Sequence, residues 1–231
     1  MREAFDVRTL DSAQATHEAA GVLDEIWRGD RGAMPANVLR ALEHAGNYVV
    51  GVYYDDRIIG AAVAFFGPPE SRSLHSHIAG VLPEFQGRGV GRLLKEHQRR
   101  WALERGAEVI TWTFDPLVAR NAHFNMNVLG AEVAEYLVDH YGAMADGLNR
   151  GDASDRLLAR WVMAEGRGER ANPELIRARV AVPLDIARVR AEAPAEAARW
   201  RRQVRSDFLA HLDAGLRVVG FDSGAYLFDR P

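Results

Sequence analysis

A glycine-rich turn between a predicted strand and a predicted helix constrains this 231-residue chain more than any other feature. Apolar, β-forming residues over 74–82 lead into Gly87, Gly89 and Gly91, and a helical pattern continues from there to Gly106. Glycines let the backbone present consecutive N–H groups, and a helix N-terminus adds about half a positive charge. The turn therefore predicts an anion cradle suited to a pyrophosphate, within an α/β fold.

The spacing of the glycines separates three interpretations of the turn. A dinucleotide-binding turn has the pattern Gly-x-Gly-x-x-Gly, and here the third glycine comes one residue early. A phosphate-binding P-loop requires Gly-Lys-Ser/Thr, whereas Gly91 precedes Arg92 and Leu93. A tight strand–helix turn without a ligand is the third interpretation. If the cradle does bind an anion, Arg88 and Arg92 add positive charge at its rim.

The rest of the chain alternates between strand and helix patterns, without an internal repeat. Strands are expected over 5–10, 47–54, 57–66, 108–114 and 131–141, and helices over 11–27, 35–44, 118–129 and 191–214. A short apolar run covers 157–163, and a terminal hairpin is expected over 216–228. We predict a core over residues 1–165 and a C-terminal extension over 166–231, which is too short for a core of its own and should pack on the first part.

Composition excludes several classes of protein. The chain is 48% hydrophobic and 26% charged, has no cysteine and carries a net charge of −3. These values argue against disorder, disulfides, thiolate metal sites and a basic nucleic-acid surface. No apolar run approaches the roughly 20 residues of a membrane span, and the N-terminus lacks a signal-peptide pattern. We therefore expect a cytoplasmic protein with no nucleic-acid partner and no membrane partner.

Arginine dominates the basic residues, since 28 of the 29 are Arg and only Lys95 is lysine. Such a bias makes an arginine by itself weak evidence for a carboxylate or phosphate site. Two sets of basic residues are expected in solvent: Lys95 with its charged neighbours on the helix before Gly106, and Arg199, Arg201, Arg202 and Arg205 on the last helix.

Several linked motifs surround the turn. Gln86-Gly87-Arg88-Gly89-Val90-Gly91 matches the signature Gln/Arg-x-x-Gly-x-Gly/Ala, and the runs Val81-x-Pro83-Glu84-Phe85, Leu93-Leu94, Asn121-Ala122-His123-Phe124 and Leu129-Gly130-Ala131 fit the same pattern. In order and spacing, residues 5–142 resemble the GNAT superfamily of acyl-CoA-dependent acyltransferases. The resemblance implies a mixed, splayed β-sheet flanked by helices, with acyl-CoA between the strands over 74–82 and 108–114.

The resemblance also implies which residues bind the co-substrate, acyl-CoA, with acetyl-CoA or succinyl-CoA as donor and no metal. The turn would hold the pyrophosphate, the end of the strand would pair with the pantetheine arm, and a later helix would lie near the lower part of that arm. These residues are Ala79, Gly80 and Val81 of the strand, Gln86, Gly87, Arg88, Gly89, Val90, Gly91 and Arg92 of the turn, and Asn121 and Phe124 of the helix.

Acyl transfer to an amine needs a neutral amine and a proton for the departing thiolate. In this superfamily an acid on the strand before the glycine turn often serves as base, but the aligned position here is Ser76, between His75 and His77. A histidine has a suitable pKa, and period-2 alternation puts His77 on the face of Ala79 and Val81. His77 is therefore the expected base.

Three further residues are candidates for catalysis. Glu84, beside the turn, is a second catalytic candidate, with a solvated or capping carboxylate as the alternative. Many relatives place a tyrosine that protonates the CoA sulfur where this chain has Met126. Tyr141 and Tyr136 are candidate substitutes, with packing as the alternative for both. The missing tyrosine also keeps open a non-catalytic acyl-CoA sensor of the same fold.

The acceptor is expected to be a small-molecule primary amine, with Arg120 and Trp112 near its site. The long extension resembles a GNAT subgroup associated with N-acylamino acid metabolism, which implies an amino acid acceptor and favours succinyl-CoA as donor. Arg120, Arg150 and Arg156 are candidate partners for a donor carboxylate. A polyamine, an antibiotic or a protein N-terminus is an alternative acceptor, and a homodimer is left open.

Overall fold

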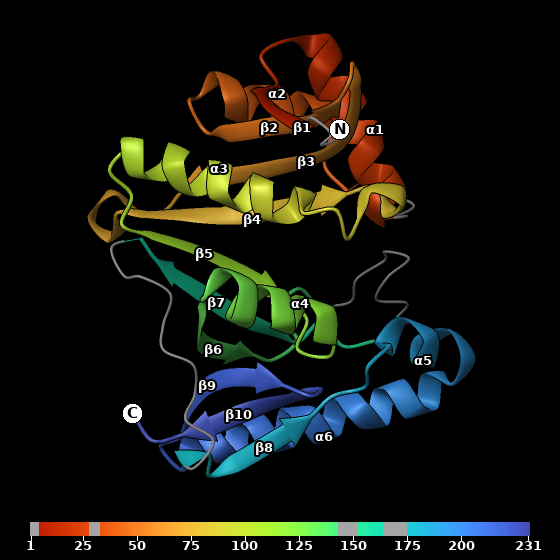
Figure 1. Cartoon of the computed structure of the whole chain (residues 1–231), viewed down its shortest axis with the longest axis vertical. Coiled ribbons are helices and arrows are strands. Elements are labelled where there is room, and N and C mark those ends of the chain that lie inside the picture. Colours follow the sequence, from red (N-terminus) through yellow and green to blue (C-terminus); the bar gives the residue numbers. More distant parts are fainter. Residues whose placement is uncertain (1–4, 28–32, 143–151, 164–174) are drawn as a thin grey trace. The chain divides into compact units, whose positions relative to one another are not determined.

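The computed structural model describes residues 5–27, 33–142, 152–163 and 175–231 and divides them into two compact units (Figure 1). The first unit comprises the described residues up to Thr111, and the second those from Trp112 onward. This boundary falls inside a strand. The expected division into a core over residues 1–165 and an extension over 166–231 stays a prediction.

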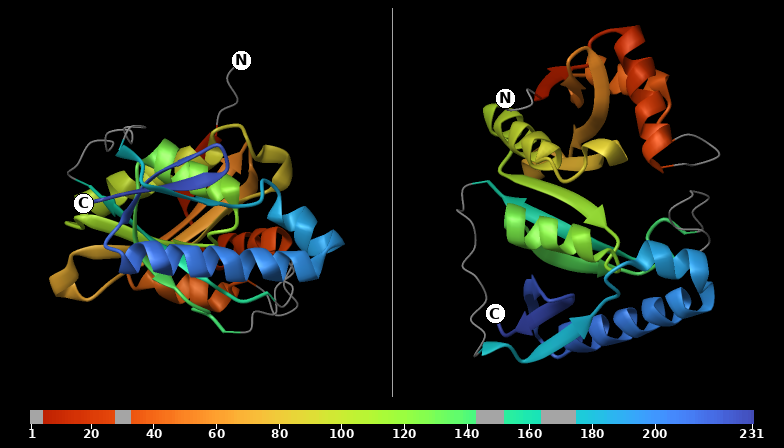
Figure 2. Two further views of the ribbon diagram at one scale, coloured as in Figure 1. Left: turned by 90° about the horizontal axis from the view of Figure 1, so that it is seen from below. Right: turned by 45° about the vertical axis from the view of Figure 1, so that its right-hand side comes forward.

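The sheet of the first unit follows the order β1 (Phe5–Thr9), β2 (Tyr48–Tyr54), β3 (Arg57–Phe66), β4 (Ser73–Val81) and the first half of β5 (Val109–Phe114). Neighbouring strands are antiparallel except β4 and β5, which are parallel. The helices α1 (Ala13–Trp27) and α2 (Ala36–His44) cover one face, and α3 (Val90–Glu104) covers the other (Figure 2). Two 3₁₀ turns, η1 (Pro69–Ser71) and η2 (Pro83–Phe85), flank β4.

Local signals in the sequence explain where these helices begin and end. Ser12 Oγ accepts a hydrogen bond from the N–H of Ala15 at 3.1 Å, which caps the start of α1. Pro35 immediately precedes α2, and Gly46 follows that helix with a φ of +80°. The buried core that α1 and α2 share with the sheet includes Leu10, Leu23, Leu39, Val49 and Val63.

β4 carries a β-bulge opposite β3. Val63 pairs with Ile78 and Ala64 pairs with Ser76, so His77 is the extra residue on β4. Ile78 packs against the core that contains Val63 and that α1 covers. The alternation of faces along β4 is therefore interrupted at His77.

The bulge overturns one expectation about His77. His75 and His77 both lie beside Phe65, with ring centroids 5.3 and 5.7 Å away, on the face that α1 covers. The residue after His77 lies on that same face, so Ala79 and Val81 point to the opposite face, toward α3. The prediction that His77 shares a face with Ala79 and Val81 is wrong, because regular alternation does not hold across a bulge.

The second unit contains the rest of β5 followed by α4 (Ala119–His123) and a π-helix, η3 (Phe124–Leu129). β7 (Arg156–Val162) lies next to β5 and pairs antiparallel with β6 (Glu132–Leu137). The remaining elements are α5 (Ile186–Glu192), α6 (Pro194–Asp213) and a small sheet in the order β8 (Ala178–Ala181), β10 (Ala225–Asp229), β9 (Arg217–Asp222).

Most predicted elements are confirmed, and the differences lie in the second unit. The helix expected over 118–129 is α-helical only in its first half, and the strand expected over 131–141 ends at Leu137. β8 and α5 have no counterpart among the predicted elements. The extension does pack on the chain after β5, since the hydroxyl of Tyr226 donates to the carbonyl of Pro116 at 2.9 Å.

Candidate functional site

Two glycines hold the turn between β4 and α3 in an open, left-handed conformation. Gly87 and Gly89 have φ values of +77° and +84°, which residues with a side chain rarely adopt. A Cβ atom at either position would meet nothing within 4 Å. The glycines are therefore required by the backbone conformation rather than by packing, and the space beside the turn is open.

Backbone N–H groups gather at the start of α3. Gly89 is the N-cap residue, and no side chain caps the helix. The N–H of Leu93 donates to the carbonyl of Gly89 at 3.0 Å. The N–H groups of Val90, Gly91 and Arg92 precede this bond and have no acceptor within the helix, as at any helix N-terminus. Together with the helix dipole, these donors suit a phosphate.

Two side chains brace the turn. Gln86 Nε2 donates to the carbonyl of Val81 at 2.9 Å, which ties the turn to the end of β4. The guanidinium carbon of Arg88 lies 5.4 Å from the ring centroid of Phe85. Gln86 thus ties the turn to β4 and the Arg88 guanidinium lies beside the turn, and the binding of acyl-CoA by both residues stays a prediction.

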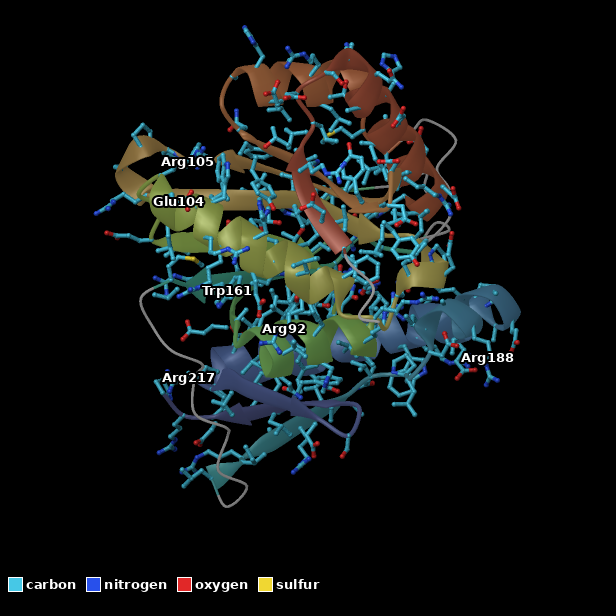
Figure 3. All side chains as sticks on the ribbon, turned by 45° about the horizontal axis from the view of Figure 1, so that its top comes forward. Arg92, Glu104, Arg105, Trp161, Arg188 and Arg217 are labelled. Atoms are coloured by element: carbon cyan, nitrogen blue, oxygen red, sulfur yellow. The ribbon has the colours of Figure 1, made fainter. Side chains whose placement is uncertain are left out.

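Two charged candidates at the turn form ion pairs in solvent. Arg92, labelled in Figure 3, pairs with Glu96 at 2.6 Å, and Glu84 pairs with Arg57 at 3.2 Å. These four side chains are between 49 and 58% exposed. Glu84 therefore lies in solvent beyond the end of β4, and the structure does not bring it together with His77.

The C-terminal part of β4 is a free strand edge within the first unit. β4 pairs with β5 over Ser73–His75 only, whereas its pairing with β3 continues to Val81. From Ser76 to Val81 this edge spans roughly 17 Å, at about 3.3 Å per residue. Backbone groups on such an edge can pair with an extended ligand. A ligand bound at the turn would reach Ser76 by following the edge.

Lys95 is buried against β4, so the expectation that it points to solvent is wrong. The residue is 7% exposed, and its Nζ donates to Ser76 Oγ at 2.9 Å and to Gln98 Oε1 at 3.2 Å. Burial lowers the pKa of the Lys95 amine to about 7. The site prediction missed this residue, and the available signal was its being the single lysine among 29 basic residues.

His77 lies on the other face of β4. Its ring centroid is 6.2 Å from that of His75, and burial lowers the pKa of the His77 imidazole below its usual 6.5. His77 is therefore neutral at pH 7 and can accept a proton. His75 Nδ1 lies 3.2 Å from Thr111 Oγ1. Ser76 and His77 are thus neighbours on β4, and Lys95 from α3 contacts Ser76 on the face opposite His77.

Four of the predicted binding residues belong to the second unit. Trp112 is 6% exposed, and its indole N–H donates to Asn125 Oδ1 at 3.2 Å, which are the contacts of a packing residue. Arg120 is exposed on α4, and Asn121 and Phe124 are half-buried where α4 continues into η3. The places of Asn121 and Phe124 along a pantetheine arm, and of Trp112 and Arg120 near the acceptor, stay predictions.

The two tyrosines considered as proton donors differ. Tyr136 is buried and its hydroxyl donates to Asp155 Oδ2 at 2.7 Å; burial and this bond raise the pKa of Tyr136. Tyr141 is exposed, and its hydroxyl lies 2.8 Å from Thr113 Oγ1. The guanidinium carbon of Arg156 is 5.4 Å from the Tyr141 ring centroid. Tyr141, Thr113 and Arg156 form a polar cluster that the sequence patterns did not group together, and Arg150 lies outside the described residues.

Within the described residues, no group of three or more His, Asp or Glu side chains could hold a metal ion. That part of the chain also includes no helix long and apolar enough to cross a membrane.

Comparison with known proteins gives a family for residues 12–125. Residues 12–125 match the model of the acetyltransferase (GNAT) family. The chain carries a GNAT acetyltransferase domain. No curated protein matches its sequence.

Solved structures share the fold of this GNAT domain. A putative acetyltransferase of the GNAT family from Desulfovibrio desulfuricans is 19% identical, with a TM-score of 0.53 over 70% of this chain and 100% of that chain. The ribosomal-protein-S18-alanine N-acetyltransferase from Escherichia coli is 13% identical, with a TM-score of 0.55 over 73% and 99%. An acetyltransferase of the GNAT family from Streptococcus pneumoniae is 12% identical, with a TM-score of 0.57 over 69% and 99%. At these identities the likeness shows the fold alone.

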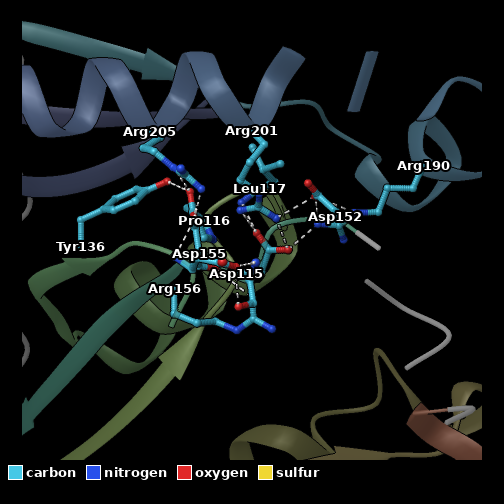
Figure 4. A network of polar contacts seen from close by, with 12 residues as sticks. Asp115, Pro116, Leu117, Tyr136, Asp152, Asp155, Arg156, Arg190, Arg201 and Arg205 are labelled. Carbon is cyan, nitrogen blue, oxygen red and sulfur yellow. Dashed lines mark hydrogen bonds and ion pairs between the residues drawn. The ribbon is translucent and has the colours of Figure 1, made fainter. Parts of the chain in front are cut away.

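A buried ion-pair network connects the GNAT domain to the extension (Figure 4). Asp115, which follows β5, accepts hydrogen bonds from Arg201 at 2.8 and 2.9 Å and from Arg190 at 2.6 Å. Asp152 accepts from Arg190 at 2.9 Å and from Arg201 at 3.0 Å. Burial alone would raise the pKa of the Asp115 carboxyl, but Arg201 and Arg190 outweigh it and lower that pKa to about 2.

This network corrects the expectation of a solvated arginine face on α6. Arg199 and Arg202 are exposed as expected, but Arg201 is only 2% exposed. Arg205 is partly buried and its Nε donates to Asp155 Oδ2 at 2.8 Å. Two of the four arginines therefore pair with carboxylates outside the extension: Arg201 with Asp115 and Asp152, and Arg205 with Asp155.

Proposed function

We propose that the chain transfers an acyl group from acyl-CoA directly to a primary amine. The observation that carries the proposal is the open glycine turn at the start of α3, next to a free strand edge that leads to Ser76 and His77. In this proposal the backbone of residues 87–92 binds the pyrophosphate. The pantetheine arm pairs with β4 from Val81 toward Ser76, because an extended arm and this edge have comparable lengths.

The proposed reaction forms a bond between the amine nitrogen and the acyl carbon and breaks the C–S bond of the thioester. Holding the two substrates together supplies much of the acceleration. His77 takes a proton from the amine, which the lowered pKa of its imidazole permits at neutral pH. The transfer is direct, without an acyl-enzyme intermediate.

In its finer form, the proposal has acetyl-CoA or succinyl-CoA as donor and an amino acid as acceptor. Arg120 and Arg156 are the described candidates for binding a carboxylate, either that of a succinyl group or that of an amino acid. Arg156 is supported by its position in the cluster with Tyr141 and Thr113.

Met126 supports a second candidate function, an acyl-CoA sensor without turnover. It lies, partly buried, in the π-helix η3. The family resemblance implies a proton-donating tyrosine at this position. A protein that binds acyl-CoA without transferring the acyl group would not need that proton donor.

Thiol release separates the two functions, because a chain without cysteine adds no thiol background. Acetyl-CoA and succinyl-CoA are mixed separately with the protein and pooled amino acids, polyamines or peptides. Acceptor-dependent release of CoA with one donor supports transfer and identifies the acyl group. A melting temperature that CoA raises, without any thiol release, supports the sensor. If neither acetyl-CoA, succinyl-CoA nor CoA binds to the protein, both candidate functions are contradicted.

Gly89→Glu tests the anion cradle itself. A carboxylate in the open space beside the turn should repel the pyrophosphate, so we expect CoA affinity to fall on the order of 100-fold, about 2.7 kcal/mol, in a calorimetric titration. Gly46→Glu is the matched control, because Gly46 also has a left-handed φ of +80° and nothing within 4 Å of its would-be Cβ. Equal CoA affinity of the two variants would contradict the cradle.

A further inference from the structure

Lys95 occupies a buried position at which arginine could not exchange a proton. Of the 29 basic residues, 28 are Arg and Lys95 is the exception. Arginine stays protonated throughout the physiological range, whereas a buried lysine can gain and lose a proton near neutrality. Lysine, unlike arginine, can exchange a proton at this buried position, and this is the one position where the arginine-rich chain has lysine.

Two polar side chains lie against the Lys95 amine. Ser76 Oγ at 2.9 Å and Gln98 Oε1 at 3.2 Å both accept hydrogen bonds from its Nζ. Because Ser76 Oγ accepts from Lys95, its own hydroxyl hydrogen is free to point to a third group. Gln98 is 1% exposed, and its Nε2 has no hydrogen-bond partner among the described residues. A buried polar cluster with an unsatisfied group lowers the stability of the folded protein, and a functional role would explain why it is kept.

The cluster lies at the end of the free edge of β4. Ser76 is the first residue beyond the pairing of β4 with β5, and the glycine turn lies past the other end of that edge. The inference rests on the proposed function, in which the pantetheine arm follows the edge and brings the thioester to Ser76.

We propose that Lys95, acting through Ser76, supplies the proton that the CoA sulfur takes up when the thioester breaks. As the C–N bond forms and the C–S bond breaks, the Ser76 hydroxyl gives its proton to the sulfur. The Lys95 ammonium gives a proton to the Ser76 oxygen, so Ser76 ends as a hydroxyl and Lys95 as a neutral amine. The proton lost by the acceptor nitrogen goes to His77, and solvent recharges Lys95. Ser76 is the donor and Lys95 a positioning residue, together replacing the tyrosine that is missing at Met126.

Other titratable groups surround α3. Those on α3 and on the elements packed against it are Asp6 and Arg8 of β1, Tyr48, Tyr53 and Tyr54 of β2, His75 and His77 of β4, and Arg92, Glu96, His97, Arg99, Arg100 and Glu104 of α3. The Tyr48 hydroxyl lies 2.9 Å from His97 Nδ1, and Asp6 forms an exposed pair with Arg8 at 2.7 Å. The two β4 histidines face away from Lys95. Burial is the cause that lowers the pKa of the Lys95 amine.

The pH dependence of kcat tests the proposal, with donor and amine both saturating. We expect the wild-type kcat to fall about tenfold per pH unit above an apparent pKa near 7, because Lys95 must be protonated. Lys95→Met keeps an unbranched side chain and should lower kcat about 100-fold and remove this fall. Ser76→Ala should do the same. Arg100→Met, an exposed cation on the same helix, is the matched control and should change neither.

A single lysine also permits a readout that needs no turnover. Protein labelled with carbon-13 at the lysine Cε has one signal, which should titrate near pH 7 and shift when CoA is added. A titration midpoint near 10, the value of a solvated lysine, would overturn the proposal. So would a folded, CoA-binding Lys95→Met variant that keeps the wild-type kcat profile. If the proposed function itself fails, wild-type protein binds CoA but releases no thiol with any acceptor, and that outcome overturns both.

Discussion

His77 lies on one face of β4, and Lys95 of α3 packs against the other face. Burial lowers the pKa of both side chains. Burial disfavours the charged form of each base, so His77 is neutral at pH 7 while Lys95 exchanges its proton near that pH. In the proposed reaction His77 must be neutral and Lys95 protonated. The rate should therefore rise through the pKa of His77, below 6.5, and fall through that of Lys95.

His77→Ala tests the base at the scale of one residue. We expect kcat to fall about 100-fold, the rising limb of the pH profile to disappear, and CoA affinity to stay unchanged, because the imidazole acts on the amine and not on the cofactor. His75→Ala is the matched control, since His75 packs on the same Phe65 ring but contacts Thr111. A loss of no more than about twofold for His77→Ala would end the assignment.

At the scale of elements, the sequence predicted what depends on local signals. The glycine turn, the capped start of α1 and the strand pairs around β3 follow from periodicity and turn chemistry within a few residues. The bulge at His77 could not be predicted, because a strand with one extra residue has the same kinds of residue and the same polarity as a regular strand. The burial of Arg201 was equally hidden, since its partner Asp115 is 86 residues away along the chain.

The contact between β4 and α1 carries a prediction about Gly80. A Cβ atom at Gly80 would lie 2.6 Å from Trp27 Cη2, so no side chain fits between the strand and the helix. Gly80→Ala should lower the free energy of unfolding by about 1–3 kcal/mol, measured in urea. The loss should shrink when Trp27→Leu is added, because the clash is with that ring. Gly21→Ala on α1 is the control, because a Cβ atom there would meet nothing within 4 Å. Equal changes in the free energy of unfolding for Gly80→Ala and Gly21→Ala would contradict the clash with Trp27.

At the scale of the whole chain, the network of Asp115, Asp152, Arg190 and Arg201 makes the extension part of the fold. Two carboxylates and two guanidinium groups share one buried site, so each charge depends on partners from distant segments. Removing one partner from such a site leaves a buried charge uncompensated. The extension is thus expected to stabilise the loop after β5, from which α4 begins.

Arg201→Met tests this dependence. Asp115 and Asp152 would be left with Arg190 alone, so we expect the free energy of unfolding at pH 7 to fall by about 3–5 kcal/mol. Arg202→Met changes the exposed neighbour on the same helix and should stay within about 0.5 kcal/mol of wild type. Urea unfolding followed by circular dichroism measures both, and equal values for the two variants would contradict the role of the network.

The pH dependence of the same unfolding transition identifies Asp115 as the group that Arg201 stabilises. The folded-state pKa of Asp115, about 2, lies below its unfolded value of 3.8. Its contribution is therefore complete above about pH 4 and is lost as the pH falls toward 2. Without Arg201 the folded-state pKa should rise toward the unfolded value, so in Arg201→Met the loss is smaller and ends at a higher pH than in wild type or Arg202→Met. Parallel curves for all three proteins would mean that Asp115 keeps its charge without Arg201, and that the arginine contributes only by packing.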